Sequence, residues 1–141
     1  MYEREYDPRY LDYFDCFNQQ RFFEAHAVLE ALWLAQRQGV NGPFYQGLIQ
    51  LAGAFVHLQK NRPGPATALF ELARANLSKY PTPHDGLDVK HVQRVIDEWL
   101  RQLKTADLPA ATSISAKVWS SSANRLPFPW LCPPAGSRRR Q

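Results

Sequence analysis

The fold is decided by residues 43–60, which read PFYQGLIQLAGAFVHLQK. From Phe44 to Phe55, large apolar residues recur at helical spacing on one side, while Ile49 and Val56 fall on another side. A helix that is apolar almost all round is normally buried on most sides. We therefore expect this segment to be the central helix of an all-α domain.

Helical patterns flank the central segment on both sides. Proline suits the first turn of a helix, and Pro8 and Pro63 each open such a pattern. Asp88 is a good N-cap for a last helix, and no strand-like alternation appears in this part of the chain. We predict an antiparallel bundle of five helices, over residues 8–18, 21–38, 43–60, 63–80 and 89–104.

The 141 residues divide into two parts of different composition. Residues 1–104 carry the helical pattern and are expected to form one bundle domain. Residues 105–141 are rich in Ser, Ala and Pro, and we expect a largely irregular, mostly disordered tail. Within it, Leu126–Leu131 is a candidate clip on the bundle, because its aromatic residues are flanked by prolines.

The formal net charge of +4 comes from the tail. Residues 1–104 carry twelve basic and twelve acidic side chains, so the bundle is neutral and no nucleic-acid partner is expected. No apolar run approaches the roughly 20 residues that cross a bilayer, and the N-terminus lacks the apolar stretch of a secretion signal. We expect a cytoplasmic protein without a membrane partner, in which Cys16 and Cys132 are reduced thiols.

The second helical segment, residues 21–38, carries a histidine and a glutamate on its inward side. His26 and Glu30 are four residues apart, so on a helix they project within about 40° of each other. Leu29 and Trp33 occupy the same half of the helix. We therefore expect an imidazole and a carboxylate to point from this segment toward the core.

Polar residues also form a row on the central segment. Gln46, Gln50 and His57, together with Gly53, fall within about 60° of arc. A glycine inside a helix costs up to about 1 kcal/mol relative to alanine, which is tolerated where a neighbouring helix or a ligand comes close. The short connection Gly39–Gly42 makes the two helices antiparallel neighbours. We therefore expect the two polar rows to face each other.

Spacing alone leaves three interpretations of the facing rows. In the first, His26, Glu30 and His57 bind a divalent metal ion, and a glutamine holds a bound water. In the second, these side chains form a buried hydrogen-bond network in which the glutamine amides complete the donors and acceptors. In the third, the amide and imidazole groups orient a small polar ligand between the helices.

The same residues carry a resemblance to a known family. The chain resembles the domain of unknown function 309 family, which consists of small helical bundles. The resemblance spans about residues 10–100, and its most specific blocks are Phe22–His26, Leu29–Glu30, Leu32–Trp33 and Phe44–Ala52, with Tyr80–Pro81 and Gly86–Asp88 as a closing turn. It implies that His26, Glu30, Gln46, Gln50 and His57 stand at the characteristic polar positions of the family.

The resemblance also implies an activity, because family members are labelled predicted metal-dependent hydrolases. On this hypothesis His26, Glu30 and His57 hold a divalent metal ion that activates water, and Glu30, Gln46 and Gln50 are the candidate catalytic residues for an unidentified small-molecule substrate. This chain has Ala27 where the family has an acidic residue, which counts against catalysis. The alternative is a non-enzymatic binding or scaffold module, in which the cluster is a buried structural network.

Overall fold

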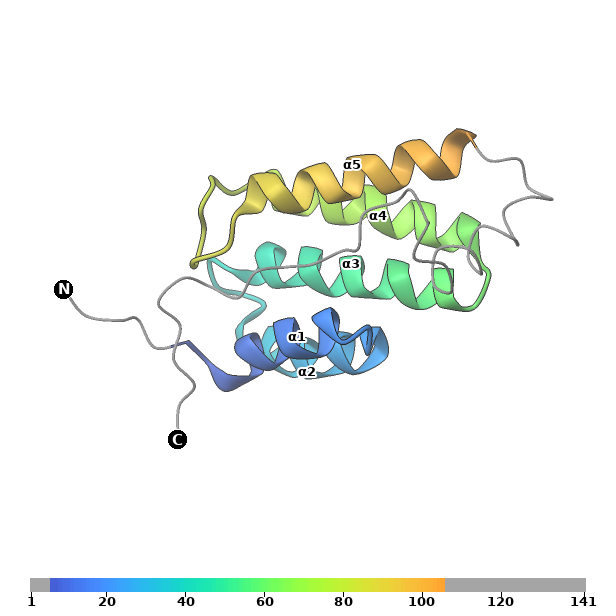
Figure 1. Cartoon of the computed structure of the whole chain (residues 1–141). Coiled ribbons are helices and arrows are strands. Elements are labelled where there is room, and N and C mark those ends of the chain that lie inside the picture. Colours follow the sequence, from blue (N-terminus) through green and yellow to red (C-terminus); the bar gives the residue numbers. More distant parts are fainter. Residues whose placement is uncertain (1–5, 106–141) are drawn as a thin grey trace.

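The structure is a computed structural model that describes residues 6–105, and these fold into five α-helices (Figure 1). The helices are α1 (Pro8–Asn18), α2 (Phe22–Gln36), α3 (Gly42–Gln59), α4 (Pro63–Leu77) and α5 (Val89–Thr105). The described residues contain no strand, only an isolated bridge between His84 and Leu87, so the all-α prediction is confirmed. The predicted irregular tail, with Leu126–Leu131 and Cys132, lies outside the described residues except for Thr105, which ends α5.

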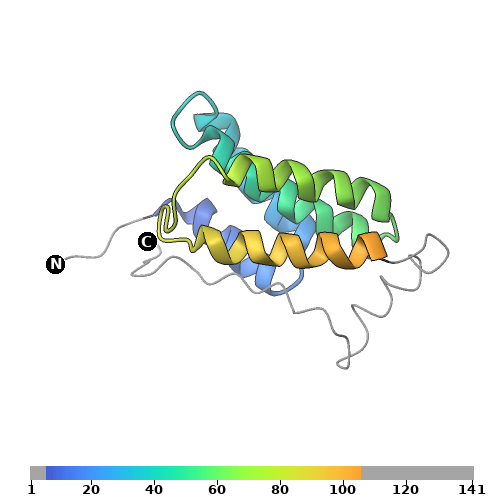
Figure 2. The same cartoon turned by 90° about the horizontal axis from the view of Figure 1, so that it is seen from above.

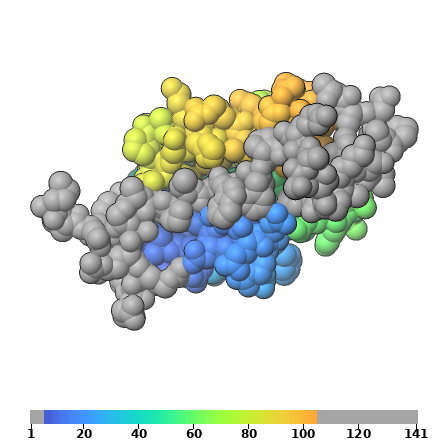
Figure 3. Space-filling view, in the orientation of Figure 1, coloured from blue at the N-terminus to red at the C-terminus, as the bar shows by residue number. Residues whose placement is uncertain are grey.

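Each helix packs against the next one along the chain, which makes α3 the centre of the bundle. Figure 2 shows α4 and α5 side by side, with α3 beneath them. In the space-filling view, the orange surface of α5 and the blue surface of α1 and α2 lie at opposite edges of the molecule (Figure 3). Within residues 6–105, no helix is long and apolar enough to cross a membrane.

Phe55 holds the five helices together. Its ring lies 5.6 Å from Phe17 of α1, 5.0 Å from Phe22 of α2, 5.2 Å from Phe70 of α4 and 5.2 Å from Trp99 of α5, measured between centroids. Three of these contacts are edge-to-face, the geometry that aromatic quadrupoles favour. Twelve of the 18 residues of α3 are buried, as its all-round apolar pattern predicts.

The helix ends follow local chemistry. Asp88 caps α5 as predicted, because its Oδ1 accepts a hydrogen bond from the His91 amide at 3.0 Å. Helix α2 ends at Gln36, two residues before the expected Gln38. At Gly42, an added Cβ would overlap the carbonyl oxygen of Arg37, the residue that follows α2. The chain therefore turns back tightly onto the end of α2, and the residue that needs to be glycine is Gly42.

Candidate binding face on α2, α3 and α4

His26 and Gly53 mark the place where three helices converge. A Cβ atom built on Gly53 would lie 3.9 Å from Cδ2 of His26 on α2 and 3.3 Å from Cδ1 of Leu69 on α4. A Cβ at position 53 would thus be in ordinary contact with His26 and in tighter contact only with the flexible end of Leu69, and the half-buried imidazole of His26 lies on the α3 side of α2.

The other polar residues lie along the same side of the bundle. Glu30, Gln46, Gln50 and His57 are each partly buried. Gln50 accepts a hydrogen bond from Nδ2 of Asn76 on α4 at 2.8 Å. We call the surface formed by these residues the α2–α3–α4 face, and it consists of Phe23, His26 and Glu30 on α2, Gln46, Gln50, Gly53 and His57 on α3, and Leu69 and Asn76 on α4.

The His57 imidazole has an unusual environment for a histidine near a helix end. Its Nδ1 atom is buried and has no hydrogen-bond partner. Burial lowers the pKa of His57, and the positive charges of Arg62 and Lys60 lower it further. The ring is therefore neutral at pH 7, which leaves one of its nitrogens as an acceptor.

The three predicted metal ligands do not come together. Residues 6–105 contain no group of three or more His, Cys, Asp or Glu side chains placed to hold a metal ion. Zinc sites need three or four such donors at about 2.0–2.3 Å. His26, Glu30 and His57 thus do not fit a three-ligand metal centre.

The physical reason is the axial register of two antiparallel helices. His26 is level with Gly53, and Nε2 of Gln59 donates to the Gln20 carbonyl at 3.2 Å, in the same register. Glu30 is one turn after His26 on α2 and is therefore level with residue 49 of the antiparallel α3. His57 is one turn after Gly53 on α3, which is in the opposite direction from His26. The axial offset between Glu30 and His57 is therefore about 12 Å.

The predicted hydrogen-bond network is not formed either. Among His26, Glu30, Gln46, Gln50 and His57, no side chain donates to or accepts from another of the five, and the bond from Asn76 to Gln50 is the one hydrogen bond that their side chains make within residues 6–105. The structure therefore brings the five residues to one face without joining them.

Apolar side chains border this face. Phe23 is 68% exposed, and its ring lies nearly parallel to that of His26, at 11° and 6.4 Å between centroids. Trp33 is half-buried on the same side of α2, and the Arg37 guanidinium lies 5.8 Å from its ring centroid. Leu34 on α2 is 55% exposed. The polar row thus has aromatic and aliphatic neighbours on α2.

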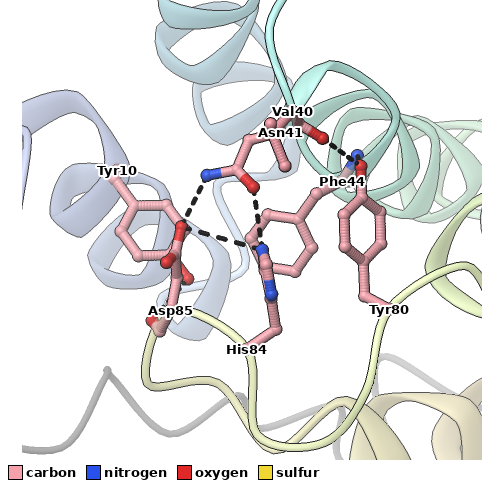
Figure 4. A network of polar contacts seen from close by, with 7 residues as sticks. All are labelled: Tyr10, Val40, Asn41, Phe44, Tyr80, His84 and Asp85. Carbon is pink, nitrogen blue, oxygen red and sulfur yellow. Dashed lines mark hydrogen bonds and ion pairs between the residues drawn. The ribbon is translucent and has the colours of Figure 1, made fainter.

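A second polar cluster, which the sequence did not reveal, closes the end of the bundle where α3 begins (Figure 4). Asn41, between α2 and α3, accepts a hydrogen bond from His84 Nε2 at 2.8 Å and donates from Nδ2 to Asp85 Oδ2 at 2.7 Å. Tyr10 of α1 donates to the Asp85 carbonyl at 3.0 Å. These contacts tie the α4–α5 connection to α1 and to the start of α3.

Aromatic rings enclose His84 in this cluster. Its ring centroid lies 4.6 Å from those of both Phe44 and Tyr80. The Tyr80 hydroxyl donates to the Val40 carbonyl at 2.7 Å and accepts from the Phe44 amide at 3.0 Å. With these neighbours, the side chain of His84 is only 20% exposed. We call Tyr10, Asn41, Tyr80, His84 and Asp85 the loop latch.

Residues 10–69 match the model of a family described as Domain of unknown function (DUF309). The resemblance to DUF309 is confirmed. The DUF309 match covers α1, α2, α3 and the first part of α4, so it contains all five predicted polar residues. It ends before the closing turn at Tyr80. Searches of curated proteins and of solved structures found no match to this chain.

Proposed function

We propose that this chain is a non-enzymatic binding module that takes a small polar ligand on the α2–α3–α4 face. One observation carries the proposal. Five polar side chains lie partly buried on this face, and in the described part of the chain only Gln50 among them makes a side-chain hydrogen bond, to Asn76. Apart from the buried Nδ1 of His57, the unpaired polar atoms of these side chains are accessible to a ligand.

The chemistry of the face defines the ligand class. Gln46 supplies an amide donor and acceptor, neutral His57 supplies an acceptor, and Glu30 supplies a carboxylate. A ligand that replaces water on such groups needs both donors and acceptors at matching positions. The exposed ring of Phe23 offers an apolar surface beside them. We therefore propose a compact ligand with amide-like polarity and one flat or apolar side.

A metal-dependent hydrolase stays an untested prediction for this chain. Its three proposed ligands do not converge, and Ala27 replaces the acidic residue expected after His26. The binding module is supported better, because it needs no convergence on a single ion. A cytoplasmic location is part of the same proposal.

The test is a fragment screen by two-dimensional NMR on the full chain, with primary amides, carboxylates and nucleobases as probes. We expect at least one probe to shift the side-chain amide signals of Gln46 and Gln50. Its dissociation constant should rise about tenfold in Gln46→Ala, which corresponds to roughly 1.4 kcal/mol. It should not change in Gln38→Ala, which removes an exposed glutamine outside the face.

Two results would contradict the proposal. The first is a screen in which no probe shifts these signals. The second is an increase of melting temperature with Zn²⁺, Mn²⁺ or Mg²⁺ that disappears in both His26→Ala and His57→Ala. This result would mean that the two histidines bind a metal ion.

A further inference from the structure

The outer side of α2 is apolar and exposed. Phe23 and Leu34 are 68% and 55% exposed, and they project within about 20° of each other on the helix. Ala27 and Ala31, which lie between them, are exposed as well. A helix that is apolar all round is normally covered on most sides. We call Phe23, Ala27, Ala31 and Leu34 the α2 stripe.

A segment of the same chain has the chemistry to cover the stripe. Residues 126–131 read LPFPWL and are rich in apolar and aromatic side chains. Proline-rich segments with such side chains dock on surfaces lined by aromatic residues, because little conformational entropy is lost. Phe23 is the aromatic residue of the α2 stripe, whereas the partly buried Trp33 lies on the neighbouring side of α2 beneath the Arg37 guanidinium.

Charge favours this pairing. Within α2, Glu24 and Glu30 are acidic and no residue is Lys or Arg. Glu24 forms an ion pair with Arg21, directly before the helix, so Glu30 carries the charge argument. Residues 105–141 carry five basic side chains and one acidic side chain, including Arg125 directly before the apolar segment. Opposite charges on the two segments favour their encounter and suppress docking on basic surfaces.

The chain is long enough to make the contact. Helix α5 ends at Thr105, at the end of the bundle where α2 begins (Figure 1). The twenty residues 106–125 can span up to about 66 Å when extended. The 15 residues of α2 are about 22 Å long. The whole α2 stripe is therefore within reach.

We propose that Leu126–Leu131 docks on the α2 stripe of its own chain. Phe128 and Trp130 contact Phe23 and Leu34, and the small side chains of Ala27 and Ala31 make room for them.

The test uses the cysteine that follows the segment. In full-length chains with Cys16→Ser, native Cys132 is paired with either Ala27→Cys on the stripe or Ala68→Cys, an exposed position on α4. In a glutathione buffer the two protein thiols lose their protons and two electrons and form one S–S bond, while oxidised glutathione is reduced to two thiols. The fraction of intramolecular disulfide gives the effective concentration of the segment at each position.

We expect the effective concentration to be at least tenfold higher at position 27 than at position 68. Phe128→Ala with Trp130→Ala, or Leu34→Asp, should remove this preference, whereas Leu72→Asp, a matched change of an exposed leucine on α4, should leave it intact. Equal values at the two positions would overturn the proposal. Disulfide-linked dimers that increase with protein concentration would overturn it too, because they would mean that the stripe is contacted by a second copy of the chain.

The two proposals fail separately. If the disulfide preference holds but no probe shifts the Gln46 and Gln50 signals, the docking stands and the ligand proposal falls. If a probe binds with equal affinity in the presence and absence of Phe128→Ala and Trp130→Ala, and the disulfide preference is missing, only the docking falls.

Discussion

His26 of α2 lies against Gly53 of α3, with its Cδ2 atom 3.9 Å from the position that a Cβ of residue 53 would take. This contact shows the axial register between the two helices that carry the polar rows, in which residue 26 is level with residue 53. It places His26 at the middle of the α2–α3–α4 face, with Glu30 and His57 on opposite sides of it along the helix axis.

The first prediction compares two glycine substitutions. Gly53→Ala adds a Cβ that meets the flexible end of Leu69 at 3.3 Å, whereas in Gly42→Ala the Cβ overlaps the Arg37 backbone. In a helix interior, alanine is more favourable than glycine by up to about 1 kcal/mol. We expect Gly53→Ala to change the free energy of unfolding by less than about 1 kcal/mol and Gly42→Ala to lower it by about 1–3 kcal/mol. Urea denaturation would measure both, and equal losses would show that the tight turn at Gly42 is not required.

The second prediction concerns the ring shared by all five helices. Phe55→Ala removes its contacts with rings on α1, α2, α4 and α5 and leaves a cavity at the centre of the core. We expect it to lower the free energy of unfolding by about 3–5 kcal/mol. Leu72→Ala on α4 is the surface control, since Leu72 is 50% exposed, and should cost less than about 0.5 kcal/mol. Thermal unfolding of the pair decides, and a small loss for Phe55→Ala would contradict its central role.

Much of the fold could be predicted from the sequence, because apolar residues that recur at helical spacing indicate where the helices lie. The all-round apolar pattern identified α3 as the central helix, and Asp88 identified the start of α5. The angular positions of His26 and Glu30 were also predictable. Whether side chains on two helices meet depends, however, on the axial register as well, and a helical wheel carries no information about that offset.

The loop latch could not be predicted for a different reason. Asn41 and His84 are 43 residues apart and lie in connections without periodicity. Their contact depends on how two loops meet at one end of the bundle. The positive φ values of Asp85 and Gly86, 47° and 77°, shape the turn that brings them together.

The third prediction tests this latch. Asn41 bonds both His84 and Asp85, so Asn41→Ala leaves two partly buried polar groups without these partners. We expect a loss of about 1–3 kcal/mol in the free energy of unfolding. Asn41→Asp keeps the shape but places a carboxylate within 2.7 Å of the Asp85 oxygen, so at pH 7 it should be more destabilising than alanine. If Asn41→Asp were the milder change, the assigned direction of the Asn41 amide would be wrong.

The last prediction follows from the lowered pKa of His57, whose causes are burial first and then the charges of Arg62 and Lys60. The folded protein binds a proton at His57 less readily than the unfolded chain, whose histidine titrates near 6.5. The contribution of His57 to stability is therefore fully present above pH 6.5 and is lost as the pH falls through the folded-state pKa. Replacing His57 with Gln should make unfolding less sensitive to pH between 7.5 and 5, with chemical denaturation at each pH as the measurement.

An NMR titration of the His57 ring gives the same quantity directly. Its midpoint should lie below 6.5, and Arg62→Gln should raise it, because one of the positive charges that oppose protonation is removed. Lys90→Gln, an exposed change on α5, serves as the control and should leave the midpoint in place. A midpoint at or above 6.5 in the parent chain would mean that the imidazole is solvated, and His57 would then no longer offer the α2–α3–α4 face a neutral acceptor at pH 6.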